Sequence, residues 1–160
     1  FRLQIVWTGF FDGAAQPTNP GHASIGVVIL DSKENTIYEK GEYIGYNTNN
    51  YAEYTALIDL LEFCVCNGID DIVICGDSQL VINQMNGIYQ VKSCKIWPLF
   101  MRAQQLKRKI KNISFEWVPR EKNKRADTLS KKALNISDRR SPRVFALLEI
   151  DDNYMTNGSS

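Results

Sequence analysis

The stretch LQIVWTGFFDGAAQPTNPGHASIGVVILDSKENTIYEKGEYIGY, residues 3–46, decides the fold class because it holds three strand-like segments in close succession. Residues 3–11 are apolar, aromatic and β-branched, which predicts a buried strand. Residues 23–31 predict a second strand, and residues 36–46 alternate as a third strand would. Short connections that are rich in turn-forming residues separate the three segments. The stretch therefore predicts an antiparallel meander.

Helices and strands alternate in the rest of the chain. Apolar residues recur at helical spacing over 52–64, and Thr48, Asn49 or Asn50 can cap that helix. The continuous apolar run at 72–75 predicts a central strand that is covered on both faces. Further elements are expected as a helix over 78–85, a helix over 98–111, a strand over 113–118 and a helix over 121–134. The predicted fold is α/β in the order β-β-β-α-β-α-α-β-α: a mixed five-stranded sheet, three antiparallel strands and then two parallel ones, with helices on both faces.

The length and composition predict one globular domain. The chain has 160 residues, of which 44% are hydrophobic, enough for a full core. We assign residues 1–135 to this domain and residues 136–160 to a C-terminal extension, in which 144–150 predict an added strand or a docking segment before a frayed end. The first residue is Phe rather than Met, which suggests a piece of a longer chain. No apolar run reaches the roughly 18 residues that span a membrane.

The four cysteines predict core thiols rather than a metal site. None of them forms a C-x-x-C pair, and the one histidine, His22, is far away in the sequence, so a zinc site is not expected. Cys64 and Cys75 fall in apolar stretches, which favours buried thiols in a reducing compartment. We therefore expect a cytoplasmic protein.

The small net charge of +1 hides an asymmetry between the two halves. Residues 1–76 contain three Lys or Arg against ten Asp or Glu, whereas residues 77–160 contain sixteen against eight. An acidic half beside a basic half suits a metal site next to a groove for a polyanion. Basic helices with solvated faces explain the same charges equally well.

Four carboxylates stand at the predicted boundaries of elements. Asp12 ends the first apolar strand, Glu53 lies in the first turn of a helix, Asp77 follows the run at 72–75, and Asp127 lies in the last helix. Each has a simpler explanation alone: a turn, the helix dipole, a helix cap or a solvated helix face. Their joint placement around one sheet instead predicts a convergent acidic cluster. Such a cluster needs cations, and its hard oxygen ligands suit Mg²⁺ or Mn²⁺.

Five local strings carry a resemblance to a known family. They are FDGAA (11–15), NPGHASIGVV (19–28), NNYAEYTAL (49–57), GDSQLVINQMNG (76–87) and VPREKNKRADTLSKKA (118–133). In order and spacing they resemble the motifs of type 1 ribonuclease H, in the compact branch found in archaea, many bacteria and reverse-transcriptase-like proteins. The resemblance covers about residues 4–135.

The resemblance implies an endonuclease that cuts the RNA strand of an RNA/DNA hybrid with two Mg²⁺ or Mn²⁺ ions, leaving 5′-phosphate and 3′-hydroxyl ends. It places the metal ligands at Asp12, Glu53, Asp77 and Asp127, beside the backbone of Gly13. It also implies recognition of the 2′-hydroxyl and of DNA phosphate by a larger set of residues. These are Gly13, Ala15, Asn19, Thr48, Asn49, Asn50, Gln79, Arg120 and Asn123.

The chain departs from the family pattern in two places. Residues 87–100 leave little room for the basic helix-and-loop insertion with which some members grip the hybrid. Many members also carry a His before the last acid, where this chain has VPREKNKRAD. Arg120 is the candidate for an electrostatic part of that role, although a guanidinium cannot serve as a base near neutral pH.

Lys and Arg of 102–111 and 120–132 are expected to contact phosphates, and Trp97 and Trp117 are expected in the core rather than stacked on nucleotides. We expect a monomer that binds no membrane, with dimerisation through the C-terminal extension left open. The alternatives are a non-catalytic hybrid-binding module of a larger polymerase-like protein and a DNA-directed nuclease or integrase.

Overall fold

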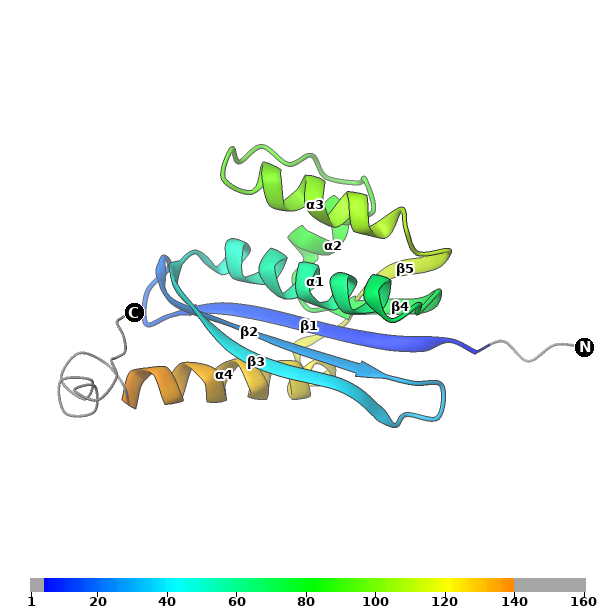
Figure 1. Ribbon diagram of the computed structural model, residues 1–160. Coiled ribbons are helices and arrows are strands. Elements are labelled where there is room, and N and C mark those ends of the chain that lie inside the picture. The colour runs from blue at the N-terminus through cyan, green and yellow to red at the C-terminus, as the bar shows by residue number, and fades with distance from the viewer. Residues whose placement is uncertain (1–4, 140–160) are drawn as a thin grey trace, which may run out of the picture.

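The computed structural model describes residues 5–139, which form a five-stranded sheet covered by helices (Figure 1). In chain order the elements are β1 (Trp7–Gln16), β2 (Gly21–Leu30), β3 (Thr36–Asn47), α1 (Asn49–Cys66), β4 (Asp71–Gly76), α2 (Gln79–Met85), α3 (Trp97–Lys107), β5 (Asn112–Trp117), the short 3₁₀ helix η1 (Arg120–Lys122) and α4 (Lys124–Arg139). The predicted element order is confirmed.

The sheet is mixed, as predicted. Its strand order is β3-β2-β1-β4-β5. β1, β2 and β3 pair antiparallel, whereas β4 lies parallel to both β1 and β5. Helices α1, α2 and α3 lie on one side of the sheet and α4 lies on the other (Figure 1). The predicted fold class is therefore confirmed.

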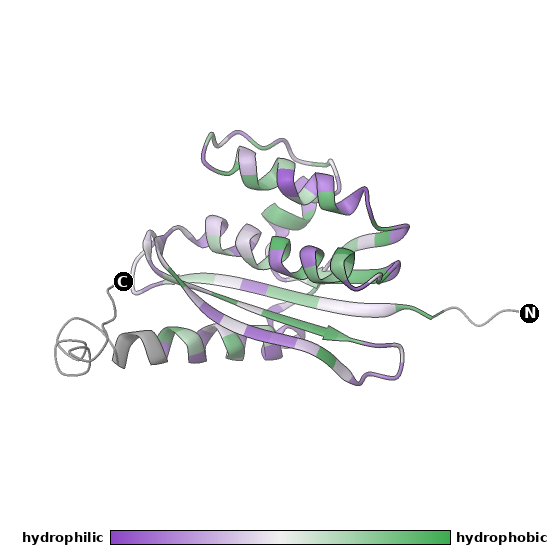
Figure 2. Cartoon of the chain, viewed as in Figure 1, coloured by the Kyte–Doolittle hydropathy of each residue, from purple (hydrophilic) through white to green (hydrophobic). Residues whose placement is uncertain are grey.

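The core lies mainly between the sheet and α1. Ile25 and Ile29 of β2 and Leu57, Leu60 and Leu61 of α1 are fully buried. Figure 2 shows that β1 is coloured hydrophobic or neutral along most of its length, in keeping with its central place in the sheet. No helix within residues 5–139 is both long enough and apolar enough to cross a bilayer.

β1 lies further along the chain than predicted: it begins at Trp7 rather than at residue 3 and ends at Gln16 rather than at residue 11. The expected break after Asp12 is wrong, because residues 13–16 continue the ladder with β2, and Asp12 itself pairs with Gly26. The parallel pairing with β4 nevertheless ends at Phe11 opposite Gly76. Asp12 is therefore inside the antiparallel ladder but just beyond the end of the parallel one.

Two helix boundaries also differ from the prediction. α3 ends at Lys107 rather than at residue 111, because a turn in which Ile110 N–H donates to Lys107 O carries Ile110 into the core. The last helix does not begin at residue 121: η1 comes first, and α4 starts at Lys124. The expected added strand at 144–150 lies outside the described residues.

Two glycines allow α4 to lie directly on the sheet. Gly26 of β2 and Gly41 of β3 are register partners. A Cβ atom on Gly26 would overlap the backbone of Ala126, and one on Gly41 would overlap the carbonyl of Leu129. Because both positions lack a side chain, the helix approaches closely enough to bring its first turns near Asp12 of β1.

Candidate metal centre and active site

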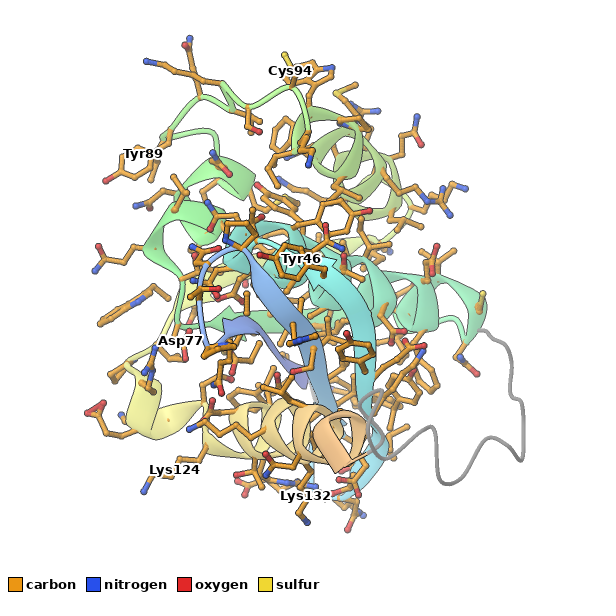
Figure 3. The ribbon with its side chains drawn as sticks, turned by 90° about the vertical axis from the view of Figure 1, so that its left-hand side faces the viewer. Tyr46, Asp77, Tyr89, Cys94, Lys124 and Lys132 are labelled. Atoms are coloured by element: carbon orange, nitrogen blue, oxygen red, sulfur yellow. The ribbon has the colours of Figure 1, made fainter. Side chains whose placement is uncertain are left out.

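Three of the four predicted carboxylates come together. Asp12, Glu53 and Asp77 each offer an oxygen, and these atoms all lie within 4.8 Å of one another. The strand register explains two of them: Phe11 pairs with Gly76, so the residues that follow leave adjacent parallel strands side by side. The third comes from the first turns of α1, which packs on β1. Figure 3 shows Asp77 on the end of the molecule that faces the viewer.

Gly13 makes the close approach of α1 possible. Its N–H donates to Oε1 of Glu53 at 3.1 Å. A Cβ atom at this position would overlap the backbone of Ala52 and Glu53. The absence of a side chain therefore lets the helix present its carboxylate beside Asp12 of β1.

Asp77 is held at both its backbone and its side chain. Nε1 of Trp117 donates to the Asp77 carbonyl at 3.1 Å, and Nδ2 of Asn123 donates to the Asp77 carboxylate at 3.4 Å. The simpler role as a helix cap belongs to Ser78, whose Oγ accepts from Val81 N–H at 3.2 Å. The Asp77 carboxylate is thus left to face the other acids.

Asp127 joins the cluster through Asp12. Its carboxylate lies close to that of Asp12 and raises the pKa of Asp12. Asp127 also forms an ion pair of 3.0 Å with Lys131, one turn further along α4. It lies outside the tight group of three oxygens and is partly exposed.

Burial makes the cluster electrostatically unfavourable. The pKa of Asp12 is raised to about 8. Burial is the largest cause, followed by the charge of Asp77 and the contact with Asp127. Burial and the charges of Asp12 and Asp77 raise the pKa of Glu53 well above its usual value. The nearby Arg120 lowers the pKa of both groups, and the Gly13 N–H lowers that of Glu53, without cancelling the effect. Crowded, buried carboxylate oxygens fit hard divalent cations such as Mg²⁺ or Mn²⁺.

Several predicted substrate residues lie beside this cluster and are tied to one another. The Ala15 N–H donates to Oδ1 of Asn49 at 2.6 Å, and the Asn49 N–H donates to Oδ1 of Asn19 at 2.9 Å. Thr48 caps α1, as predicted, by accepting from Tyr51 N–H at 3.1 Å. These bonds connect the β1–β2 turn to the start of α1. Asn50 lies partly buried in the first turn of α1, and Gln79 is exposed at the start of α2.

Three residues lie in surroundings that the sequence did not predict. Asn123 was expected to contact substrate, but its side chain is only 1% exposed and donates to Phe11 O at 2.9 Å. Trp97 and Trp117 were expected in the core, but they are 49% and 46% exposed. The expectation failed because Trp97 opens α3 and Trp117 ends the edge strand β5, where each ring has solvent on one side. The side-chain amide of Asn123 gives no periodic signal by which its burial could have been recognised.

Comparison with known proteins places this arrangement in a family. The family model described as Reverse transcriptase-like matches residues 10–133. Ribonuclease HI of Halobacterium salinarum is 40% identical over 126 residues, which cover 79% of this chain and 63% of the relative. The chain belongs to the type 1 ribonuclease H family. The predicted resemblance is therefore confirmed.

Solved structures agree with this ribonuclease H assignment. Ribonuclease H1 from Halobacterium salinarum matches with a TM-score of 0.78 and 39% identity over 82% of this chain and 98% of that one. The N-terminal ribonuclease H domain of Rv2228c from Mycobacterium tuberculosis matches with a TM-score of 0.81 and 33% identity over 86% and 99%. LC11-RNase H1 in complex with an RNA/DNA hybrid matches with a TM-score of 0.76 and 40% identity over 84% and 99%.

The curated relatives are longer than the part that this ribonuclease H chain matches. The chain spans 63% of the Halobacterium protein. It spans 32% of the bifunctional protein Rv2228c, to which it is 38% identical over 118 residues.

Proposed function

We propose that this ribonuclease H chain hydrolyses the RNA strand of RNA/DNA hybrids with two divalent cations, Mg²⁺ or Mn²⁺, leaving 5′-phosphate and 3′-hydroxyl ends. The observation that carries the proposal is the convergence of Asp12, Glu53 and Asp77 within 4.8 Å. The hybrid in the complex of the similar LC11-RNase H1 supports the choice of substrate. When bound, a pair of such cations supplies an activated water and neutralises the leaving oxygen.

The roles proposed for the chain's own residues follow from their positions. Asp12 lies between the other acids and is the candidate for the ligand shared by both ions, with the Gly13 backbone beside it. We assign Asp77 to the side of the attacking water and Glu53 to the side of the leaving group. Asp127, which is more exposed and paired with Lys131, completes the first ion site more loosely.

We assign recognition of the hybrid to the residues around the start of α1. The linked Ala15, Asn19 and Asn49, with Asn50 and Gln79, lie where amides can donate to and accept from a 2′-hydroxyl. Thr48 is the candidate contact for a DNA phosphate, although its Oγ already accepts from the backbone of α1.

Arg120 is proposed to contribute charge rather than a proton. It is exposed, and its charge acts on both Asp12 and Glu53. A guanidinium at this place attracts phosphate but cannot accept a proton near neutral pH. We therefore propose a pH profile without a histidine limb.

We propose residues 1–135 as the catalytic domain, acting as a monomer, because all four acids come from one chain. The thiols of Cys64 and Cys75 are buried and unpaired, which supports a reducing, cytoplasmic location.

A duplex panel tests the proposed function. Labelled RNA/DNA, RNA/RNA and DNA/DNA duplexes are incubated with the protein in Mg²⁺, Mn²⁺ or EDTA, and the cut strand and its ends are mapped. We expect cutting of the RNA strand of the hybrid only, with metal only, and a loss of nearly all cutting in the folded Asp77→Asn variant. Hybrid binding without cutting would favour a binding module, and cutting of DNA would favour a DNA-directed nuclease. Cutting that survives EDTA would reject the two-metal mechanism.

A further inference from the structure

We propose that Asn123 is a positioning residue that sets the Asp77 carboxylate and the start of α4 against β1, with Trp117 supporting the same acid from its backbone side. The inference rests on the proposed function, because it concerns the geometry of the proposed metal ligands. It gives Asn123 a role that does not depend on contact with the substrate.

Asn123 links the segments that carry three of the four acids. Its Nδ2 donates to Phe11 O at 2.9 Å, directly before Asp12, and to Oδ2 of Asp77 at 3.4 Å. Its backbone carbonyl accepts from Asp127 N–H at 3.1 Å, which begins the hydrogen bonding of α4. One residue therefore contacts β1 directly before Asp12, the acid after β4 and the backbone of the acid on α4.

The hydrogen bonds of the Asn123 amide show that its NH2 group, and not its oxygen, explains why an amide is present. The Asn123 side chain is 1% exposed, and its Oδ1 is the buried side-chain oxygen that finds no hydrogen-bond partner among the described residues. Leaving a buried acceptor unpaired is unfavourable, and an apolar side chain of the same shape would avoid this. The amide is therefore explained by what Nδ2 donates. Donors of this kind orient metal ligands and strongly affect metal affinity.

Trp117 provides a second contact to the same acid. Its Nε1 donates to the Asp77 carbonyl at 3.1 Å, while Val118 N–H donates to Gly76 O at 2.9 Å. The backbone of Asp77 is thus attached to the end of β5, and its carboxylate to Asn123. Both contacts act without any metal, so they orient the acid before an ion arrives.

The test measures Mn²⁺ binding by calorimetry together with thermal stability. We compare the wild type with Asn123→Leu, which keeps the branched shape of the side chain but removes its donor, and with Asn123→Ala. The matched control is Asn86→Ala, because Nδ2 of Asn86 also donates to a strand carbonyl, that of Phe115 at 3.1 Å, but makes no contact with the acids. We expect both Asn123 variants to bind Mn²⁺ about 10–100-fold more weakly, and the control to bind it like the wild type.

The outcomes separate this inference from the proposed function. Folded Asn123 variants that bind Mn²⁺ with wild-type affinity overturn the positioning role, even if their melting temperatures fall, because a purely structural residue would behave in that way. If neither variant folds, Trp117→Phe decides the question: a roughly tenfold loss of affinity supports the role, and unchanged affinity rejects it. A wild type that cuts the hybrid beside variants of unchanged affinity rejects the inference alone. A wild type that binds Mn²⁺ but cuts nothing rejects the proposed function alone.

Discussion

Asp12 shows how the buried acidic cluster lowers the stability of the folded protein. The residue is 6% exposed and lies among three other carboxylates. Its pKa rises from 3.8 to about 8, mainly because burial disfavours the charged form. In the folded state without metal the residue therefore holds its proton far more tightly than in the unfolded chain.

This difference predicts the pH dependence of stability. A raised pKa in the folded state stabilises the fold at pH values below 3.8, and this contribution is lost as the pH rises to about 8. In EDTA, we expect Asp12→Asn to be more stable than the wild type at pH 8, by on the order of 5 kcal/mol, and the gain to shrink towards pH 4. Urea unfolding at several pH values measures it.

Asp31 serves as the control for this prediction because its shift has the opposite sign. Hydrogen bonds from the backbone of Asn35, followed by those from the Asn35 side chain and Lys33, lower its pKa. It therefore contributes stability above its ordinary pKa that is lost on acidification. Asp31→Asn should destabilise at neutral pH. An Asp12→Asn variant that destabilises the metal-free protein at pH 8 would contradict the electrostatic account.

Gly13 predicts a steric effect at the same site. A Cβ at this position overlaps the backbone of Ala52 and Glu53, so Gly13→Ala must displace α1. We expect a loss of about 1–3 kcal/mol in the free energy of unfolding, together with a loss of Mn²⁺ affinity. Gly9→Ala on the same strand is the control, because its Cβ would meet only the flexible side chain of Leu60 at 2.9 Å. Equal effects from the two substitutions would show that the close packing of α1 against Gly13 is not what makes this glycine necessary.

At the scale of elements, the packing of α4 on the sheet decides where Asp127, the fourth acid, lies. Gly26 pairs with Asp12 in the sheet and lies beneath Ala126, the residue before Asp127. Oγ of Ser24 also donates to the Ser130 carbonyl at 2.8 Å, which ties the helix to β2. The strand that flanks Asp12 thus also supports the helix that carries its partner.

Gly26→Ala tests this arrangement. The added methyl group pushes α4 off the sheet, so we expect a loss of about 1–3 kcal/mol in stability and a clear loss of hybrid cutting. Ser24→Ala removes a hydrogen bond without adding bulk and should cost only about 1 kcal/mol with most activity kept. Unfolding curves and cutting rates of the two variants provide the comparison. Full activity in Gly26→Ala would mean that cutting of the hybrid does not depend on the observed position of Asp127.

For the whole molecule, the basic residues fall at two different ends. Lys122, Lys124 and Lys132 are exposed and form no ion pair among the described residues, and Figure 3 shows Lys124 and Lys132 below Asp77. The basic residues at 108–111 lie beside the start of β5, which pairs with the start of β4. Asp77 follows the other end of β4, so only the first group borders the acids.

The positions of these two groups predict which basic residues contribute to the affinity for the hybrid. The triple variant Lys122→Ala, Lys124→Ala and Lys132→Ala should bind the hybrid more weakly and reduce the slope of log K against log salt by about two to three. The matched triple variant Arg108→Ala, Lys109→Ala and Lys111→Ala removes the same charge from the far end and should leave the slope unchanged. Titrations in EDTA at several salt concentrations measure both. An equal loss in the two variants would point to net charge rather than to a contact surface.

The order of the elements and the identity of the acids were predictable from the sequence because they depend on local patterns. The apolar run at 72–75 with Asp77 after it, the helical spacing after Thr48 and the string that carries Asp12 are all visible within short windows. The antiparallel pairing of β1, β2 and β3 follows from their short connections, and the helices that precede β4 and β5 favour parallel pairing of those strands, so the mixed sheet was predictable as well.

Contacts between distant segments were decided only by the tertiary structure. The sequence does not show that Gly13 faces α1 or that Gly26 faces α4, because each needs a partner at least forty residues away. The same holds for Asn123. In the sequence it looks like a polar surface residue, but in the fold its amide donates to Phe11 and Asp77. Local propensity acts over a few residues, whereas burial and hydrogen bonding of a side chain depend on which elements pack around it. The residue types of the site were therefore set by the sequence, and their distances and protonation by the packing of β1, β4, α1 and α4.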